Sequence, residues 1–457
     1  MQSYDVIIIG SGTAGQTAAY DLKDAGLNVA LVENSERPGG TCALAGCQPK
    51  KWFYEVAEVI AKSRHLQTKG ITTAAAGDWH AVWEQKQKFT DNIPDGTVNG
   101  FYEAGIDFLP GTAAFKDDHI LYVDGQAFGA DFFIVATGAK PAAIPLEGAE
   151  HLVTSSEFLE RSSLPGRIVF VGGGFISFEF AHFAARIGPQ NRSITILEAK
   201  DQPLQLFDQE MVDLLLKASA EDGIDVRSNI QITAIDKQDD IFCVLTDSEL
   251  SFEADLVVHG AGRVADIEDL NLESIGVSAS KKGIQVNAQM QTKVPHIFAA
   301  GDCAATAALA RVADFEAHVA AKNIIAIRKD AALMAADYRA VPFVLFSYPQ
   351  YGMVGQTETA LKREGTTYRK NTAVGVQWPT YRRVGIQHAG YKILVAEDDT
   401  ILGAHVVSDN ASGLINTLRQ AIIEGTTTEK LYWHNIMSPY PSRESDIVYM
   451  LKTLIKK

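Results

Sequence analysis

The feature that most constrains the fold of this chain is an apolar segment that runs into a glycine-rich turn near the N-terminus. Residues 4–33, YDVIIIGSGTAGQTAAYDLKDAGLNVALVE, predict a buried strand, a turn, an amphipathic helix and a second strand. Gly10, Gly12 and Gly15 complete a GxGxxG pattern, and Glu33 follows Gly10 by 23 residues. Such glycines let the backbone approach a pyrophosphate at the helix N-terminus, and the acid accepts hydrogen bonds from ribose hydroxyls. The stretch therefore predicts a dinucleotide-binding unit.

The same order of elements occurs a second time, in residues 167–198, RIVFVGGGFISFEFAHFAARIGPQNRSITILE. Here Gly172 and Gly174 are followed by Ser177 in the place of the third glycine, and Glu198 follows Gly172 by 26 residues. A single glycine-rich turn is a weak signal. Two of them, each inside a strand, helix and strand pattern that ends in an acid, favour two nucleotide sites. We predict an α/β fold with two Rossmann-like dinucleotide-binding domains.

Composition and charge indicate a globular protein of several domains. A chain of 457 residues, 46% hydrophobic and 21% charged, is long enough for about three globular domains. With 41 basic and 56 acidic residues its net charge is −15, which argues against binding to nucleic acid or to an anionic membrane. No apolar stretch reaches the length of a membrane span, and the N-terminus lacks the pattern of a signal peptide. We expect a cytoplasmic protein.

Two of the four cysteines, Cys42 and Cys47, lie in the segment GGTCALAGCQPKKW, residues 39–52. Two cysteines alone are compatible with a metal clip, a structural disulfide or a redox pair. In a reducing compartment a close pair is more often catalytic or metal-binding than structural. A zinc site would require two further ligands, and Cys243 and Cys303 have no partner at CxxC spacing, so we predict no metal site.

Three later segments end apolar strands in small residues: DFFIVATGAKP (131–141), DLVVHGAGRVAD (255–266) and HIFAAGDCA (296–304). With these motifs, both fingerprints and GGTC, the chain resembles from end to end the FAD-dependent pyridine nucleotide-disulfide oxidoreductases, the family of glutathione reductase, dihydrolipoamide dehydrogenase and mercuric reductase. The stretch VPFVLFSYPQYGMVGQTE (341–358) is similar to the start of that family's dimerisation domain.

The resemblance implies an FAD-binding domain formed by residues 1–147 and 264–335, an NAD(P)-binding domain at 148–263, and a C-terminal α+β dimerisation domain at 336–457. It also implies a homodimer whose active site is completed across the interface. The cofactor-binding positions that match the family's motifs are Gly10, Gly12, Gly15, Glu33, Gly40, Thr41, Thr137, Gly138, Gly172, Gly174, Glu198, Gly262 and Asp302.

The resemblance also implies roles for the cysteine segment. Cys42 and Cys47 match the family's redox-active disulfide, with Cys47 nearest the flavin and Cys42 attacking the acceptor. Lys51 matches a lysine near flavin N5, where positive charge stabilises reduced flavin, and Glu179 matches its usual glutamate partner. A helix beginning near Pro49 is expected to lower the pKa of the thiolate through its positive end.

Glu198, the acid that ends the second glycine-rich motif, indicates which nicotinamide coenzyme the chain prefers. Glu198 can accept hydrogen bonds from both ribose hydroxyls of NAD, whereas a 2′-phosphate would meet like charge there. No arginine pair follows Glu198, so we predict NADH rather than NADPH as the coenzyme. Lys200 and Arg192 are the nearby cations that could instead bind the 2′-phosphate of NADPH.

The C-terminus departs from the family pattern. In SPYPSRESD (438–446), Tyr440 stands where the family has a histidine and Ser445 where it has a glutamate, the general acid/base pair that acts from the partner subunit. A phenol is almost fully protonated at neutral pH, so it is a poor base, and it cannot carry the positive charge that stabilises a thiolate. It can donate a hydrogen bond to a leaving thiolate.

Three functional hypotheses follow from these retained and missing residues. We predict a flavoprotein oxidoreductase that passes electrons from NAD(P)H through FAD and the cysteine pair to a small disulfide or related sulfur acceptor, with Tyr440 as hydrogen-bond donor. The retained Cys42, Cys47 and Lys51 favour this function. The absent histidine and glutamate favour the alternative, a reductase of a quinone, a metal ion or oxygen. A donor of electrons to a protein partner is the third hypothesis.

Overall fold

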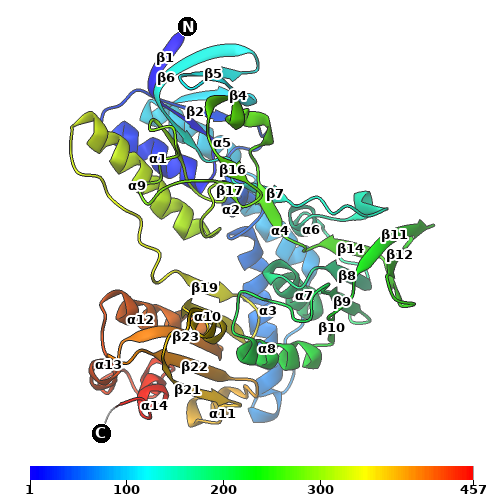
Figure 1. Cartoon of the computed structure of the whole chain (residues 1–457). Coiled ribbons are helices and arrows are strands. Elements are labelled where there is room, and N and C mark those ends of the chain that lie inside the picture. The colour runs from blue at the N-terminus through cyan, green and yellow to red at the C-terminus, as the bar shows by residue number, and fades with distance from the viewer. Residues whose placement is uncertain (456–457) are drawn as a thin grey trace. The chain divides into compact units, whose positions relative to one another are not determined.

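The computed structural model describes residues 1–455. Residues in contact with one another form two compact units, each built from segments that are distant in the sequence. The first unit contains residues 1–52, 83–143 and 262–337, and the second contains 53–82, 144–261 and 338 onward. Figure 1 labels their helices and strands.

A seven-stranded sheet forms the centre of the first unit. Its order is β3 (Asp107–Pro110), β2 (Val29–Glu33), β1 (Gln2–Ile9), β6 (Gln126–Val135), β5 (Ile120–Val123) and β4 (Ala113–Asp117), and β18 (Ile297–Ala299) also pairs with β6. Strand β1 is parallel to β2 and β6. Val6 and Ile8 pack on one face of the sheet and Ile7 on the other, which is why the run VIII is continuously apolar.

Figure 1 shows α1 (Thr13–Asp24) beside α9 (Ala310–Arg328), and the two helices make extensive contact. Both contribute alanines to the core on the Val6 face of the sheet. The other elements with residues in this unit are α2 (Gly40–Leu44), α3 (Pro49–Leu66), α4 (Trp79–Thr90), α5 (Ile93–Ala104), η3 (Glu268–Leu270), η4 (Leu272–Ile275), and the two-stranded pairs β7 (Ala139–Pro141) with β15 (Arg263–Ala265) and β16 (Ala279–Ser280) with β17 (Gly283–Ile284).

The second unit contains a parallel sheet and two antiparallel sheets. The parallel sheet has the order β10 (Ile224–Arg227), β9 (Ser193–Leu197), β8 (Arg167–Val171) and β14 (Leu256–His259), and it is accompanied by α6 (Ser155–Leu159), α7 (Phe175–Ile187) and α8 (Gln209–Glu221). A three-stranded sheet contains β11 (Ile232–Gln238), β12 (Ile241–Thr246) and β13 (Ser251–Ala254). Two short 3₁₀ helices, η1 (Gln67–Lys69) and η2 (Ala149–His151), also belong to this unit.

The C-terminal part of this unit is a five-stranded antiparallel sheet. Its order is β19 (Pro342–Leu345), β20 (Gln350–Gly355), β23 (Ile401–Ser408), β22 (Gly390–Val395) and β21 (Arg369–Val374). The helical elements are α10 (Glu358–Glu364), α11 (Pro379–Val384), α12 (Ala411–Ile423), α13 (Thr428–Asn435), η5 (Glu444–Asp446) and α14 (Ile447–Leu451). The α/β class predicted from the sequence is confirmed.

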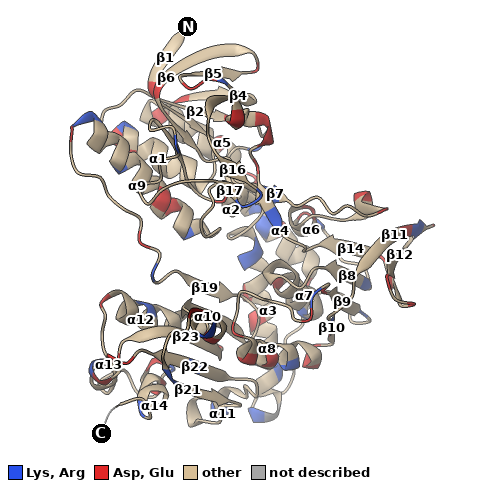
Figure 2. Ribbon diagram, in the orientation of Figure 1, with Lys and Arg blue, Asp and Glu red and all other residues tan. Residues whose placement is uncertain are grey.

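Acidic and basic residues both occur along α9, as the red and blue segments of its ribbon in Figure 2 show. No helix within residues 1–455 has the length and apolarity needed to cross a bilayer.

Candidate active site

The first glycine-rich turn, between β1 and α1, has no room for side chains. A Cβ on Gly10, whose φ is +107°, would lie 2.4 Å from the carbonyl oxygen of Ala136, and one on Gly15 would lie 1.8 Å from that of Gly10. Gly12 begins α1 without a side-chain cap. The first N–H groups of the helix are therefore open to an anion, as a pyrophosphate site requires.

The segment that carries the cysteine pair packs against this turn. Gly40 has a φ of +76°, and a Cβ there would lie 2.3 Å from the Cα of Gly12. The hydroxyl of Ser11 accepts a hydrogen bond from the amide of Gly39 at 2.9 Å. Helix α2, which begins at Gly40 and contains Thr41 and Cys42, is therefore held at the nucleotide turn. The sequence analysis did not assign a role to Ser11, although a hydroxyl between two turn glycines is a visible signal.

The acids that end the two glycine-rich motifs, Glu33 and Glu198, accept hydrogen bonds from equivalent backbone amides. Glu33 accepts from the amide of Ser11 at 2.8 Å and from that of Ser35 at 2.8 Å. Glu198 accepts from the amide of Gly173 at 2.7 Å and from that of Lys200 at 2.9 Å. In both turns the acid thus binds the residue after the first glycine and the residue two positions beyond itself. The two glycine-rich motifs therefore share the same hydrogen-bond pattern as well as the same order of elements.

The second turn accommodates a serine in place of the third glycine. Ser177 is fully buried and its hydroxyl donates to the carbonyl oxygen of Gly172 at 2.5 Å. Space for it comes from Gly260, because a Cβ at that position would lie 1.9 Å from the Ser177 hydroxyl. Gly174 begins α7 without a side-chain cap, as Gly12 does for α1. Gly260 was not singled out from the sequence, since only the fold places the end of β14 beside this turn.

Three further predicted cofactor-binding positions of the first unit, Thr137, Gly138 and Asp302, follow strands that end at one edge of the sheet. Strands β1, β6 and β18 are parallel, so their carboxyl ends lie together. Thr137 and Gly138 follow β6, and Asp302 follows β18. The carbonyl oxygen of Gly262 accepts from the amide of Ala142 at 3.1 Å, beside the β7–β15 pair. Burial raises the pKa of the Asp302 carboxyl, and Arg263, which the sequence analysis missed, opposes that rise.

Cys42 and Cys47 share a side-chain hydrogen bond. That hydrogen bond and burial raise the pKa of the Cys42 thiol well above its usual range. Helix α3 begins at Pro49 as predicted. The contribution of its positive end to the ionisation of the cysteine pair stays a prediction.

The other predicted catalytic residues are divided between the units: Lys51 belongs to the first, Glu179 and Tyr440 to the second. The side chain of Glu179 is buried within α7 and accepts from the amide of Phe346 at 3.0 Å. Tyr440 is 76% exposed. The pairing of Lys51 with Glu179 stays a prediction.

The turn after Tyr440 contains Ser445, the residue that stands where the family has a glutamate. The amide of Ser442 donates to the hydroxyl of Ser445 at 3.1 Å, and the amide of Ser445 donates to the hydroxyl of Ser442 at 3.1 Å. Ser445 is buried. Arg443 donates to both carboxylate oxygens of Asp409, at 2.5 and 3.0 Å. Within the described residues this turn is closed by its own side chains, so Tyr440 is the exposed polar group there.

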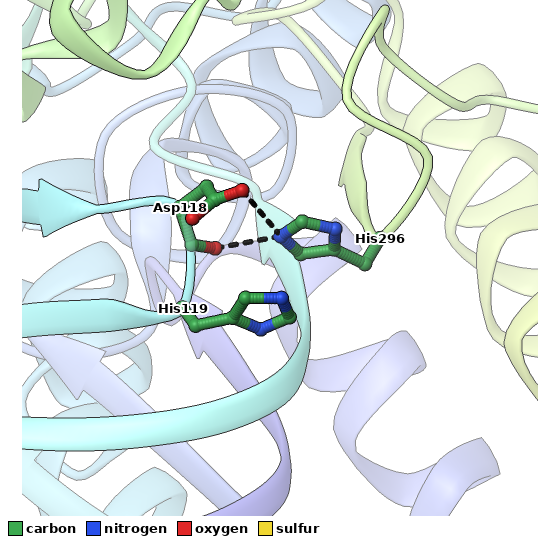
Figure 3. Close-up of side chains that lie close together, drawn as sticks. All are labelled: Asp118, His119 and His296. Atoms are coloured by element: carbon green, nitrogen blue, oxygen red, sulfur yellow. Dashed lines mark hydrogen bonds and ion pairs between the residues drawn. The ribbon is translucent and has the colours of Figure 1, made fainter.

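A second polar cluster lies outside these sites, where Asp118, His119 and His296 come together (Figure 3). The two imidazole rings are stacked, with centroids 4.0 Å apart and planes 5° apart. Candidate ligand atoms of the three residues lie within 4.8 Å of one another. A bound metal ion lies in the plane of each imidazole, about 2 Å from its nitrogen, and two parallel planes share no such point. As arranged, the cluster joins the β4–β5 turn to the segment before β18, with the His296 Nε2 bonded to the carbonyl oxygen of Asp118 at 2.7 Å.

The glycine turns, uncapped helix starts and ribose-type acids fit two dinucleotides, and comparisons with known proteins agree. The family described as pyridine nucleotide-disulphide oxidoreductase matches residues 4–317, and its dimerisation domain matches residues 341–450. The chain is 31% identical over 440 residues to a mercuric reductase of Staphylococcus aureus, covering 94% of this chain and 78% of that protein. It is 32% identical over 361 residues to a dihydrolipoyl dehydrogenase of Bacillus subtilis (strain 168), covering 77% of each.

Among solved structures, the HOCl-induced flavoprotein disulfide reductase RclA from Escherichia coli has the same fold, with a TM-score of 0.86 at 24% identity over 99% of this chain and 100% of that chain. The chain belongs to the pyridine nucleotide-disulphide oxidoreductase family. It is an FAD-dependent oxidoreductase that takes electrons from a pyridine nucleotide and acts on sulfur groups. The predicted fold of two nucleotide-binding domains and a dimerisation domain is confirmed, and the last of these supports a homodimer.

Proposed function

We propose that this protein reduces a small disulfide or a related sulfur compound with NADH, and that Cys42 and Cys47 are its redox pair. The observation that carries the proposal is the placement of the pair. Cys42 shares a hydrogen bond with Cys47 and lies two residues after Gly40, whose backbone packs on the Gly12 turn of the first nucleotide site. A structural or metal-binding pair has no need of that position.

Bound FAD supplies the two-electron transfer between nicotinamide and the disulfide. The chain's own residues perform the exchange with the acceptor. The Cys42 thiolate attacks one sulfur of the acceptor disulfide, whose S–S bond breaks, and the first product leaves as a thiolate that takes up a proton. Cys47 then attacks the Cys42 sulfur, which forms the Cys42–Cys47 disulfide and releases the second thiol. In the proposed dimer Tyr440 of the partner subunit donates a hydrogen bond to the leaving thiolate.

The preference for NADH rests on Glu198. Its carboxylate is fixed by the amides of Gly173 and Lys200, so it stands at the end of β9 as an acceptor for ribose hydroxyls. The cations that could favour a 2′-phosphate are engaged: Lys200 Nζ donates to Gln205 at 2.7 Å, and Arg192 donates to the carbonyl oxygen of Pro189 at 2.8 Å.

A second candidate function is the reduction of a quinone, a metal ion or oxygen. The exposed Tyr440 and the self-contained Ser442–Ser445 turn favour it, because neither supplies a base. The 31% identical relative is named for mercuric ion reduction. Against that substrate, no cysteine follows Cys303 in this chain to deliver the metal.

One experiment separates the two candidates. Wild-type protein and Cys42→Ser are tested in steady state with NADH and NADPH against glutathione disulfide, lipoamide, coenzyme A disulfide, polysulfide, quinones and metal ions. We expect disulfide turnover that Cys42→Ser abolishes. Disulfide turnover that survives in Cys42→Ser, or turnover with quinones alone, would contradict the proposal. Anaerobic NADH titration adds an independent check, since a redox-active pair takes up about four electrons per FAD rather than two.

A further inference from the structure

We propose that Glu316, a fully buried acid on α9, is a positioning residue for FAD binding, because it fixes the turn after β18 that carries Asp302. The inference rests on the FAD-binding role that the family motif implies for Asp302. Neither the glycine-rich motifs nor the family resemblance singled out Glu316.

The contact that carries the inference joins Glu316 to the residue before Asp302. The Glu316 Oε2 accepts a hydrogen bond from the amide of Gly301 at 2.7 Å, and both residues are buried. A carboxylate acceptor makes this hydrogen bond stronger than one to a neutral group. A buried amide that loses its acceptor costs free energy, so the conformation of the turn depends on this side chain.

The turn lies where three elements of the first unit meet. Gly301 has a φ of +78°, and a Cβ there would lie 3.2 Å from the Cβ of Ala313 on α9 and 3.4 Å from that of Ala14 on α1. Ala14 is the second residue of the helix that begins at the first glycine-rich turn. The turn that carries Asp302 therefore adjoins the expected pyrophosphate site, within one unit of the structure.

The other side of the turn is fixed as well. Asp302 is half-buried and lies between two buried residues, Gly301 and Cys303. The thiol of Cys303 donates to the carbonyl oxygen of Val135 at 3.2 Å, which ties this side of the turn to β6. With Glu316 holding the Gly301 side, Asp302 keeps one place at the carboxyl edge of the sheet. FAD then binds without the cost of ordering the turn.

The test measures how fast FAD leaves the full-length holoenzyme after dilution, from the rise in flavin fluorescence. Wild type is compared with Glu316→Gln, whose amide oxygen still accepts from Gly301, and with Glu316→Met, which has a similar size but no acceptor. We expect release at least about tenfold faster from Glu316→Met, and within about threefold of wild type from Glu316→Gln. If Glu316→Met yields no holoenzyme, Glu316→Asp, which withdraws the acceptor by one methylene, should release FAD faster than Glu316→Gln.

A double variant separates positioning from general stability. If Glu316 acts through Asp302, Glu316→Met combined with Asp302→Ala should release FAD no faster than Asp302→Ala alone, because the positioned group is already absent. Additive accelerations, or release from Glu316→Met as slow as from wild type, would overturn the inference. A wild-type rate in Asp302→Ala would instead refute the FAD-binding role of Asp302 itself.

Asn323→Leu is the matched control on the same helix. Asn323 is also fully buried, and its side-chain oxygen accepts from a backbone amide, that of Met334, at 2.7 Å. Its loss should lower the midpoint of urea unfolding but leave the rate of FAD release within about twofold of wild type. Release from Asn323→Leu as fast as from Glu316→Met would contradict the inference, because any lost hydrogen bond on α9 would then have the same effect.

Discussion

At the scale of single residues, Gly40 must be glycine for two separable reasons. Its φ of +76° lies in the left-handed region, and its missing side chain lets the backbone approach Gly12. Gly26 has a similar φ of +86°, but a Cβ there meets nothing within 4 Å. Substituting Gly26 therefore introduces backbone strain alone, whereas substituting Gly40 also blocks the close approach of two segments.

We predict that Gly40→Ala loses bound flavin, because α2 must move away from the Gly12 turn, which we propose to hold the pyrophosphate of FAD. Gly26→Ala should cost only about 1 kcal/mol of unfolding free energy and keep its flavin. The ratio of flavin to protein absorbance after purification, with thermal denaturation of both variants, checks this. Full flavin content in Gly40→Ala would show that the approach of Gly40 to Gly12 is not needed.

At the scale of secondary-structure elements, Ser177 on α7 and Gly260 after β14 form one packing unit. A Cβ on Gly260 would meet the Ser177 hydroxyl at 1.9 Å and the carbonyl oxygen of Val171 at 3.2 Å. Serine at one position therefore requires glycine at the other.

A double-mutant cycle measures this coupling. Gly260→Ala alone should destabilise the protein by about 2 kcal/mol and weaken binding of the pyridine nucleotide, because overpacking displaces the turn. Adding Ser177→Gly should recover at least half of that loss, a coupling of about 1 kcal/mol or more. Additive losses in denaturant unfolding of the two single variants and the double variant would refute it.

A buried ion cluster joins three other elements of the second unit. Lys392 on β22 donates to Asp208 at 2.8 Å and to Glu358 of α10 at 2.9 Å, and all three side chains are buried. Burial by itself would raise the pKa of Glu358, but hydrogen bonds from Lys370 and Lys392 hold it well below its usual range. A carboxylate with a lowered pKa stabilises the fold above its unfolded value of about 4.3 and loses that contribution as the pH falls.

We predict that Lys392→Met lowers the free energy of unfolding at pH 7 by about 3 kcal/mol, because the buried Asp208 carboxylate loses its cation and Glu358 loses one of its lysine partners. The deficit should shrink as the pH falls toward about 4, because protonation then removes uncompensated negative charge. Lys362→Met is the control: Lys362 contacts the same Glu358 at 3.1 Å, but its side chain is 66% exposed, so its loss should cost under about 1 kcal/mol. Denaturant unfolding at several pH values tests both, and a deficit that grows on acidification would contradict the assignment.

At the scale of the whole molecule, the dimerisation domain presents apolar side chains to solvent. Trp433, Ile436 and Met437 are 61%, 49% and 86% exposed, and they precede Tyr440 in the chain. Large apolar side chains exposed within a few residues of one another are typical of an interaction surface. The occupant that fits is a second copy of this chain, as the family's dimerisation domain implies.

We predict that Met437→Asp weakens the dimer at least tenfold, because it places a charge in an interface core. Ile241→Asp is the control, since Ile241 is 39% exposed on β12, outside the dimerisation domain. Sedimentation of both variants over a range of concentrations measures the mass. If the active site is completed by the partner subunit, disulfide turnover should fall with the dimer fraction while flavin content stays constant.

The sequence by itself determined the features that arise from neighbouring residues. The glycine turns at Gly10 and Gly172, the acids Glu33 and Glu198, and the start of a helix at Pro49 are all local, because backbone sterics and hydrophobic periodicity act over a few residues. Only the tertiary structure decided which remote groups meet. Gly260 faces Ser177, and the hydrogen bond with Cys47 together with burial raises the pKa of the Cys42 thiol. Burial and electrostatic fields depend on segments far apart in the chain, and no local pattern encodes their distance.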